Sequence, residues 1–257
     1  MFLYEVRFEC YSDTTISQAE KAINALLDCW RYNGQIIGRE FPLVLKEAVF
    51  ACRVVSPLQD SLLEKYQSNQ VKRAKQGLHD VGLLSPKLKL LGRDINSDDS
   101  DECHTPKWQV LYTNYLQTCS PLRCGEHFTP IPLHRLPAVA NGDHKQLIKW
   151  QEDWSACDQL QMNGSILEHG ALNEISQINS RLFRRGYDLC KRLEYLTQVP
   201  TYYYLYRVGG DNLMSEQTRS CPSCGGDWRL EHSVHDIFDF KCDNCRLVSN
   251  LSWDFKS

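Results

Sequence analysis

Alternating apolar and polar positions open the chain. Residues 2–10 alternate over a β-prone sequence, a pattern typical of a half-buried strand. Thr15 and Gln18, three residues apart, match the pattern of a helix capping box. Apolar residues recur behind them at helical spacing, so we expect an amphipathic helix over 16–31.

The next segments complete a recurring arrangement. Residues 36–45 and 48–55 have the composition of two strands, and the Ser-Pro-Leu-Gln sequence at 56–59 predicts the start of a second helix that ends near His79. Residues 87–91 then predict another strand. The order strand, helix, two strands, helix, strand is that of the ferredoxin-like βαββαβ unit, with two helices on one face of an antiparallel sheet.

A polar segment follows this unit. Residues 94–102 contain five acidic side chains in nine positions and almost nothing apolar to bury, which is typical of a linker. Residues 108–116 predict a strand. Four prolines between 120 and 137 make that stretch irregular and extended rather than helical.

Helical periodicity returns in the middle of the chain. Asp143 and Gln146 begin a helix that the Asn163-Gly164 pair ends, and apolar spacing predicts one long helix over 167–197. The tyrosine-rich residues 201–207 predict a strand.

We therefore expect an α+β protein with a ferredoxin-like N-terminal unit, a mixed α/β middle region with a long helix, and a C-terminal zinc ribbon. The predicted division is a ferredoxin-like domain at 1–93, an acidic linker at 94–107, a strand and long-helix region at 108–210, and the ribbon at 211–257.

The ribbon prediction rests on two Cys-x-x-Cys pairs in the last forty residues. Cys221 and Cys224 are followed by Gly225, and Cys242 and Cys245 come 17 residues later. Two residues between cysteines let a tight turn direct both sulfurs to one point, and two such turns form a closed tetrahedral site of four thiolates for Zn²⁺.

The alternative interpretation of these cysteines is a redox dithiol or ordinary buried thiols. A redox Cys-x-x-Cys motif needs a βαβ context that this segment lacks, and neither alternative explains the second pair. With four protein ligands the site leaves no position for substrate, so we expect a structural zinc whose binding is coupled to folding. In the second pair Arg246 stands where the first has glycine, so that turn must close differently or use a nearby partner.

Composition limits the partners of such a ribbon. The chain has 257 residues, a net charge of −3 and twelve cysteines, so any nucleic-acid contact must come from a local patch. Residues 219–257 hold five basic and six acidic side chains, and the zinc site adds about two negative charges. The ribbon aromatics could stack on bases, but packing against the body of the protein is the commoner role.

Two basic groups are the candidate phosphate contacts. Lys72 and Arg73 belong to a basic run at 72–93, and Arg184 and Arg185 lie on the predicted long helix. Solvated helix faces are the commoner explanation of such runs, and the acidic linker could neutralise the first of them.

A second cluster of thiols remains open. Cys103, Cys119, Cys124 and His127 lie close in sequence, but their spacing does not match a zinc knuckle. The alternatives are a second metal site, a reactive thiol with its histidine, and a proline-rich structural loop, of which the loop is the commonest.

Sequence features also bear on compartment and activity. The charged N-terminal residues do not resemble a secretory signal, and no window approaches the ~18 apolar residues of a membrane span, so we expect a cytoplasmic protein without a membrane partner. No nucleotide-binding glycine motif, HExxH or GxSxG occurs, so the sequence offers no positive evidence for an enzyme or a small-molecule substrate.

Several segments together resemble a known group. The run at 128–137, the helix ending at Thr197, the tyrosine strand at 201–207 and the ribbon cysteines are similar to a little-characterised bacterial family of zinc-ribbon-containing, candidate nucleic-acid-binding proteins. The resemblance implies that the four ribbon cysteines bind zinc, and it implies no catalytic residue.

Two functional hypotheses follow. The first is a cytoplasmic zinc-ribbon protein that binds nucleic acid through the two basic pairs. The second is a protein–protein interaction module, an adaptor or immunity-type protein, that uses the ribbon as a docking surface. An enzyme with its site in the 119–134 loop ranks third.

Overall fold

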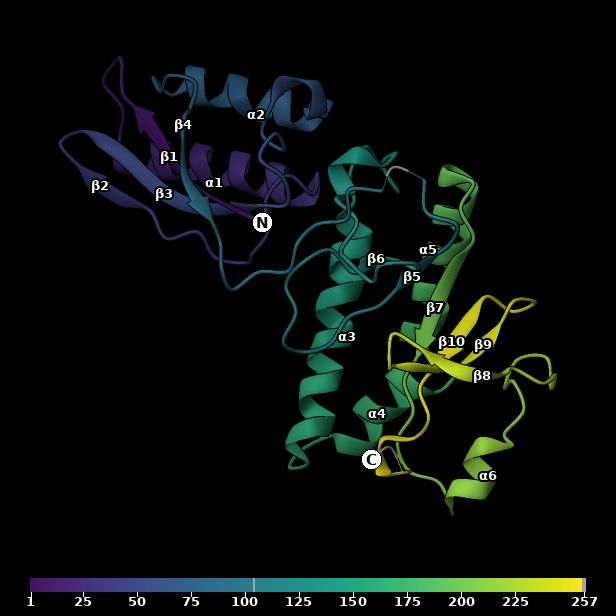
Figure 1. Ribbon diagram of the computed structural model, residues 1–257. Coiled ribbons are helices and arrows are strands. Elements are labelled where there is room, and N and C mark those ends of the chain that lie inside the picture. The colour runs from purple at the N-terminus through teal and green to yellow at the C-terminus, as the bar shows by residue number, and fades with distance from the viewer. Residues whose placement is uncertain (104, 256–257) are drawn as a thin grey trace. The chain divides into compact units, whose positions relative to one another are not determined.

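A computed structural model describes residues 1–103 and 105–255 of the chain, which forms two compact units (Figure 1). The first unit comprises Met1–Glu102, Thr118–Ser120 and Thr129–Ile148, and the second comprises Cys103–Gln117, Pro121–Phe128 and Lys149–Ser257.

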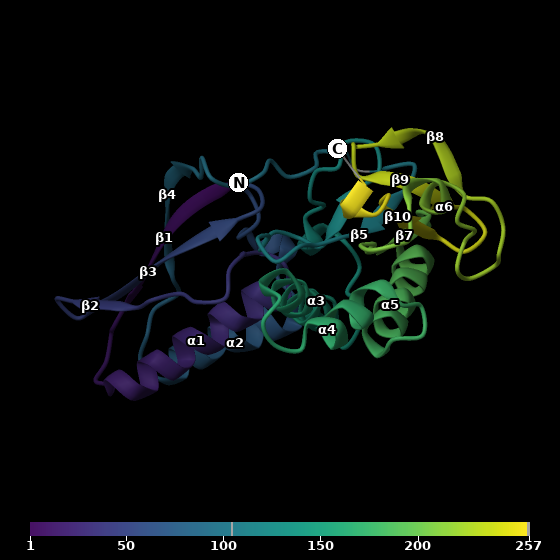
Figure 2. The same cartoon turned by 90° about the horizontal axis from the view of Figure 1, so that it is seen from below.

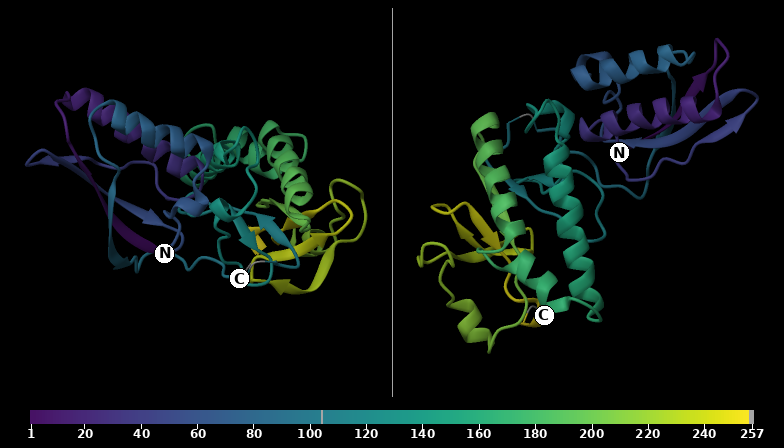
Figure 3. Two further views of the ribbon diagram at one scale, coloured as in Figure 1. Left: turned by 90° about the horizontal axis from the view of Figure 1, so that it is seen from above. Right: turned by 180° about the vertical axis from the view of Figure 1, so that it is seen from behind.

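The first unit contains a four-stranded antiparallel sheet in the order β2-β3-β1-β4. Its elements in chain order are β1 (Phe2–Glu9), α1 (Ile16–Tyr32), β2 (Val44–Lys46), β3 (Val49–Ser56), the 3₁₀ helix η1 (Glu64–Tyr66), α2 (Asn69–Asp80), β4 (Lys87–Arg93) and the 3₁₀ helix η2 (Leu133–Arg135). Both α-helices lie on one face of the sheet (Figures 2 and 3). This order and layering is the ferredoxin-like arrangement, which confirms the predicted fold of the N-terminal segment.

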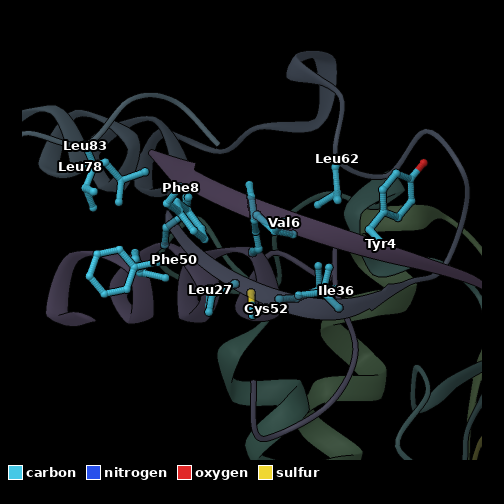
Figure 4. Close-up of a cluster of buried hydrophobic side chains, with 14 of the residues drawn as sticks. Tyr4, Val6, Phe8, Leu27, Ile36, Phe50, Cys52, Leu62, Leu78 and Leu83 are labelled. Carbon is cyan, nitrogen blue, oxygen red and sulfur yellow. The ribbon is translucent and has the colours of Figure 1, made fainter. Parts of the chain in front are cut away.

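Strand alternation explains why the helices cover that face. Tyr4, Val6 and Phe8 of β1 are buried, and they lie in one apolar cluster with Phe50 of β3 and Leu27 of α1 (Figure 4). The capping box of α1 is present as predicted, with the Thr15 side chain accepting a hydrogen bond from the Gln18 backbone N–H.

Two local predictions in this unit are wrong. Residues 56–59 do not begin a helix, because β3 extends to Ser56 and α2 begins only at Asn69, after Ser68 caps it by accepting from the Val71 N–H. Of the strand predicted over 36–45, only Ile37, in a single bridge, and Val44 and Leu45 of β2 pair with β3.

The second unit contains a six-stranded sheet in the order β6-β5-β7-β10-β9-β8. Its strands are β5 (Gln109–Leu111), β6 (Leu122–Cys124), β7 (Thr201–Leu205), β8 (Arg229–Val234), β9 (Phe238–Cys242) and β10 (Leu247–Ser249). Its helices are α4 (Glu168–Ser176), α5 (Arg181–Thr197), α6 (Leu213–Gln217) and the 3₁₀ helix η3 (Trp253–Phe255), and α3 (Lys145–Asn163) enters it from residue 149.

The long helix predicted over 167–197 is two helices in the structure. Ser180 caps α5 by accepting from the Phe183 N–H, and its hydroxyl donates to the Glu174 carbonyl at 2.7 Å. Glu174 in turn accepts from the Leu182 N–H through its carboxylate. The interruption between α4 and α5 costs little stability, because these side chains satisfy the free backbone groups at the two helix ends. The apolar periodicity of the sequence continues across it and so did not reveal it.

The tyrosine strand lies in the middle of the second sheet. All five residues of β7 are buried, with β5 parallel on one side and β10 parallel on the other. Trp150 of α3 and Phe183 of α5 contact the Tyr203 ring at centroid distances of 5.8 and 4.9 Å. The strand predicted over 108–116 is shorter than expected, since only Gln109–Leu111 pairs in this sheet.

Candidate metal centre

The structure brings the four ribbon cysteines together. The sulfur atoms of the four-cysteine cluster all lie within 4.8 Å of one another, and its members are Cys221, Cys224, Cys242 and Cys245. The Sγ atoms of Cys224 and Cys242 are 3.7 Å apart. A tetrahedral site with Zn–S bonds of about 2.3 Å requires sulfurs about 3.8 Å apart, so the cluster has the size of a metal cage.

Two tight turns position these sulfurs. In the first turn the Gly225 N–H donates to the Cys221 carbonyl and the Cys221 N–H donates to the Gly226 carbonyl, both at 2.8 Å. In the second turn, between β9 and β10, the Cys245 N–H points at the Cys242 sulfur at 3.4 Å. Backbone N–H groups directed at sulfur favour the thiolate form that a metal needs.

The second turn closes as the first does, although arginine replaces glycine. Arg246 has a φ of 51° and Gly225 a φ of 72°, so both lie in the left-handed region. The Arg246 side chain contacts the Glu194 carboxylate on α5 at 3.2 Å and donates to the Asp243 carbonyl at 2.7 Å. Of the two alternatives that the sequence left open, a different closure or a nearby partner, the structure shows the nearby partner.

Other contacts fix the second turn to the body of the unit. The Arg246 carbonyl accepts from the Tyr203 N–H at 2.9 Å, and the Cys245 carbonyl accepts from the Tyr187 hydroxyl at 3.0 Å. Asp243 accepts from the Tyr202 hydroxyl, and the neighbouring Lys241 ammonium together with this bond lowers the pKa of the Asp243 carboxyl.

The first turn is anchored by a buried ion network. Glu216 of α6 is only 3 % exposed, accepts hydrogen bonds from Arg207 and forms an ion pair of 3.5 Å with Arg219. The Arg219 guanidinium also lies over the rings of Trp228 and Phe240, at 4.7 and 3.9 Å from their centroids. Two cations around one buried carboxylate compensate for its desolvation and hold the segment that leads into Cys221.

Burial and hydrogen bonding divide the four thiols. Hydrogen bonds from the Gly226 backbone N–H and from the Cys245 side chain lower the pKa of the exposed Cys224 to about 7. Burial raises the pKa of the Cys221, Cys242 and Cys245 thiols above their usual value. All four candidate ligands are sulfur, and together they would fill a tetrahedral coordination shell, so the cluster can hold a metal.

The ribbon aromatics are packed rather than presented. Trp228, Phe238 and Phe240 are each no more than 2 % exposed, whereas Trp253 is 41 % exposed. The packing interpretation of the first three is therefore the right one, and bases have no access to their rings.

The predicted basic pairs lie on two different helices. Lys72 and Arg73 are exposed on α2 of the first unit, and Arg184 and Arg185 are exposed on α5 of the second. Arg184 donates to the Ser180 and Asn179 carbonyls, and Arg185 forms an ion pair of 2.8 Å with Asp153.

The basic run at 72–93 also divides between two faces of the first unit. Lys87 and Lys89 of β4 lie opposite Arg7 and Glu5 of β1, on the sheet face away from the helices. They therefore do not share a surface with Lys72 and Arg73.

The structure brings together two members of the second thiol cluster, Cys124 and His127. The Cys124 sulfur lies 3.6 Å from Nδ1 of His127. Cys103 and Cys119 are half-buried.

Relatives of the chain extend over all of it. Three family models, each described as a domain of unknown function, match in sequence: DUF8589 over residues 1–92, DUF2310 over 103–206 and DUF8594 over 210–255. An uncharacterized protein of Haemophilus influenzae is 50% identical over 262 residues, covering 99% of this chain and 100% of the relative. The chain belongs to the family of this Haemophilus protein.

A second member of this family and one solved structure are also similar. Another uncharacterized Haemophilus influenzae protein is 54% identical over 176 residues, which cover 68% of this chain and 86% of the relative. A Deinococcus radiodurans protein described as a "putative antibiotic biosynthesis monooxygenase" is 13% identical and covers 38% of this chain and 98% of its own, with a TM-score of 0.27. A TM-score this low does not establish a shared fold, so the ferredoxin-like arrangement of the first unit rests on its strand order.

Membrane insertion by a helix finds no support in the structure. Within residues 1–103 and 105–255, none of the helices combines the length and the apolar content that crossing a bilayer requires.

Proposed function

We propose that this family member is a zinc protein in which one structural Zn²⁺ joins the two cysteine turns of the C-terminal ribbon, whose strands belong to the six-stranded sheet. The observation that carries the proposal is the mutual approach of four sulfurs to within 4.8 Å on two turns of similar backbone conformation. An all-sulfur tetrahedral set suits zinc or iron, and the two Cys-x-x-Cys turns are the ligand pattern of zinc ribbons.

Metal content tests the proposal directly. We expect untagged protein, purified without added metal, to carry about one zinc and no iron per chain by inductively coupled plasma mass spectrometry. Cys242→Ser should lose the zinc. Cys157→Ser, which removes a half-buried thiol outside the four-cysteine cluster, should keep it. Iron in place of zinc, or equal zinc in both variants, would contradict the proposal.

Nucleic-acid binding is the second candidate function. The observation that favours it is the exposure of Lys72 and Arg73, which make no ion pair or side-chain hydrogen bond within the described residues. Arg184 is already engaged by the Asn179 and Ser180 carbonyls and Arg185 by Asp153, so both are weaker candidates for phosphate contacts.

A labelled single-stranded oligonucleotide distinguishes the partners. If the α2 pair contacts phosphates, Lys72→Glu with Arg73→Glu should weaken binding more than Arg184→Glu with Arg185→Glu, and affinity should fall steeply with salt. Wild-type affinity in both double variants, or no binding at low salt, would leave a protein partner as the surviving hypothesis. Leu213, Met214 and Trp253, which are 43, 76 and 41 % exposed, are the apolar side chains that such a partner would cover.

A further inference from the structure

The first unit has a sheet face that none of its own helices covers. Because Tyr4, Val6 and Phe8 point into the core, Glu5 and Arg7 of β1 point to the opposite face. Strand register extends this face across the sheet. Arg7 lies opposite Ala51 of β3, Glu5 lies opposite Arg53, and Ala51 lies opposite Val44 of β2.

A cavity of about 700 Å³ is hollowed into this face. It is lined by residues of β1, β2 and β3 and by the segment before β2: Glu5, Arg7, Pro42, Val44, Lys46, Glu47, Val49, Ala51, Cys52 and Arg53. Its volume lies within the range of about 300–1,000 Å³ that small-molecule sites occupy.

Two arginines face the cavity without a partner. Arg7 and Arg53 are exposed, and neither makes an ion pair or a side-chain hydrogen bond in the part of the chain that the structure describes. They are diagonal neighbours on adjacent antiparallel strands, a relationship that separates Cβ atoms by about 7–8 Å. Planar guanidinium groups on long stems at that spacing can converge on one carboxylate, sulfonate or phosphate group.

The floor of the cavity is apolar. Val44, Val49 and Ala51 are among its lining residues, and Val44 is 60 % exposed, so its side chain is open to an apolar ligand. No aromatic ring is among the described residues that line the cavity, so bases would find nothing to stack on.

Charge also argues against a second copy of the chain as the occupant. The uncovered face carries more basic than acidic side chains: Arg7, Lys46, Arg53, Lys87 and Lys89 against Glu5, Glu9 and Glu47. A symmetric contact would bring this positive face against itself, and like-charge contacts disfavour association.

We propose that this cavity binds a small organic anion. Its acidic group lies between Arg7 and Arg53, and its apolar body lies on Val44, Val49 and Ala51. Glu5, directly opposite Arg53, is placed to accept a hydrogen bond from a hydroxyl or amino group of the same molecule. This site is separate in residues and in chemistry from the four-cysteine cluster.

A matched pair of fluorescent probes tests both halves of the site. 1-Anilinonaphthalene-8-sulfonate carries an anionic group on an apolar body, and N-phenyl-1-naphthylamine is the same body without the sulfonate. We expect the full zinc-loaded chain to bind the sulfonate saturably at one site. The uncharged probe should bind about tenfold or more weakly, because it lacks the sulfonate that forms charge-assisted hydrogen bonds with the two arginines.

Variants assign the binding to this cavity. Arg7→Met with Arg53→Met should weaken the sulfonate about tenfold or more and leave the uncharged probe unchanged. Lys72→Met with Arg73→Met removes the same charge from α2 and should change neither. Ala51→Phe, which keeps every charge but fills the floor, should weaken both probes.

Three outcomes would overturn the proposal. The first is equal sulfonate affinity in the wild type and the Arg7/Arg53 double variant. The second is that the Arg7/Arg53 double variant loses affinity for an oligonucleotide tested beside the probes but keeps its affinity for both probes. The third is a dimer seen by sedimentation that dissociates in the double variant, which would make a second copy the occupant.

Discussion

Gly225 and Arg246 occupy equivalent positions, each directly after the second cysteine of its turn, and both take the left-handed conformation at φ values of 72° and 51°. Glycine adopts this conformation without penalty, whereas for a residue with a Cβ it costs roughly 1 kcal/mol. Arg246 offsets that cost with contacts that a glycine cannot make, to Glu194 of α5 and to the Tyr202 ring. The second turn thus accepts backbone strain and gains a connection to the helix behind the sheet.

Substitutions at Arg246 separate these two effects. Arg246→Ala keeps the strained backbone and loses the ion pair, so we expect a destabilisation of about 1 kcal/mol, since the pair is about one-third exposed and partly screened. Arg246→Gly loses the same contacts but relieves the strain, so its stability should stay close to that of the wild type. Urea unfolding of the zinc-bound variants measures the difference.

Glu194→Gln serves as the matched control for this series. It removes the charge partner and leaves the turn's backbone unchanged, so it should resemble Arg246→Ala in direction. If Arg246→Gly is no more stable than Arg246→Ala, strain at this position does not contribute to stability.

Removing the metal should disturb more than the ribbon. β10 pairs with β7 in parallel over three residues, so the Cys242–Cys245 turn that precedes β10 is joined to the centre of the second sheet. An independent zinc ribbon would unfold alone when the metal leaves. Here we expect chelation to raise amide hydrogen exchange in β7, at Thr201–Leu205, as well as in the ribbon.

The first unit supplies an internal reference for this experiment. Peptides from α1 and β1, which share no sheet with the ribbon, should exchange at the same rate with and without chelator. Unchanged protection of β7 after complete zinc loss would show that the tyrosine strand is stable without its metal-bound neighbour.

Sequence pattern predicted the ferredoxin-like order and the grouping of the four cysteines because both depend on local signals. Alternation in β1 and the capping box of α1 lie within a few residues, and two Cys-x-x-Cys pairs specify one geometry. Helix ends were less predictable. Ser180 and Ser68 each cap a helix, yet serine also occurs widely in loops and on helix surfaces.

Relationships between distant segments were not predictable from one sequence. Nothing local to β10 indicates that its three residues pair in parallel with β7, about forty positions earlier. The same holds for the cavity in the first unit. Arg7 and Arg53 are ordinary outward positions of two strands until the register places them on diagonal sites. The signal available in the sequence was an arginine at an outward-facing strand position between apolar residues that face the core, which occurs in both strands.

Helix α5 packs so closely on the tyrosine strand that Gly186 should not tolerate a larger side chain. A Cβ at Gly186 would collide with the Trp150 and Tyr203 side chains, both of which are fully buried. We expect Gly186→Ala to destabilise the protein by about 1–3 kcal/mol, as overpacking in a dense core does. Gly170→Ala in α4 is the control, because a Cβ there meets nothing within 4 Å. It should stabilise by about 0.5–1 kcal/mol, and thermal unfolding separates the two.

We expect two buried histidines to make the first unit sensitive to acid. His134 and His144 are 7 and 1 % exposed, and burial lowers the pKa of each to about 4. The Gly34 carbonyl accepts a hydrogen bond from the His134 ring, and the Leu133 carbonyl accepts one from the His144 ring. The other nitrogen of each ring has no hydrogen-bond partner among the described residues. Protonation would place two positive charges in this buried site.

The direction of the pH effect follows from the lowered values. The unfolded chain binds these protons near pH 6.5 and the folded chain only near 4, so stability is complete above about pH 6.5 and falls between 6.5 and 4. At roughly 1.4 kcal/mol per pH unit, each histidine accounts for about 3 kcal/mol. Hydrogen exchange of α1 peptides, corrected for intrinsic rates, should lose protection over this window. His134→Gln with His144→Asn should flatten the dependence and His79→Gln should not, whereas an unchanged slope in the double variant would assign the acid sensitivity to other groups.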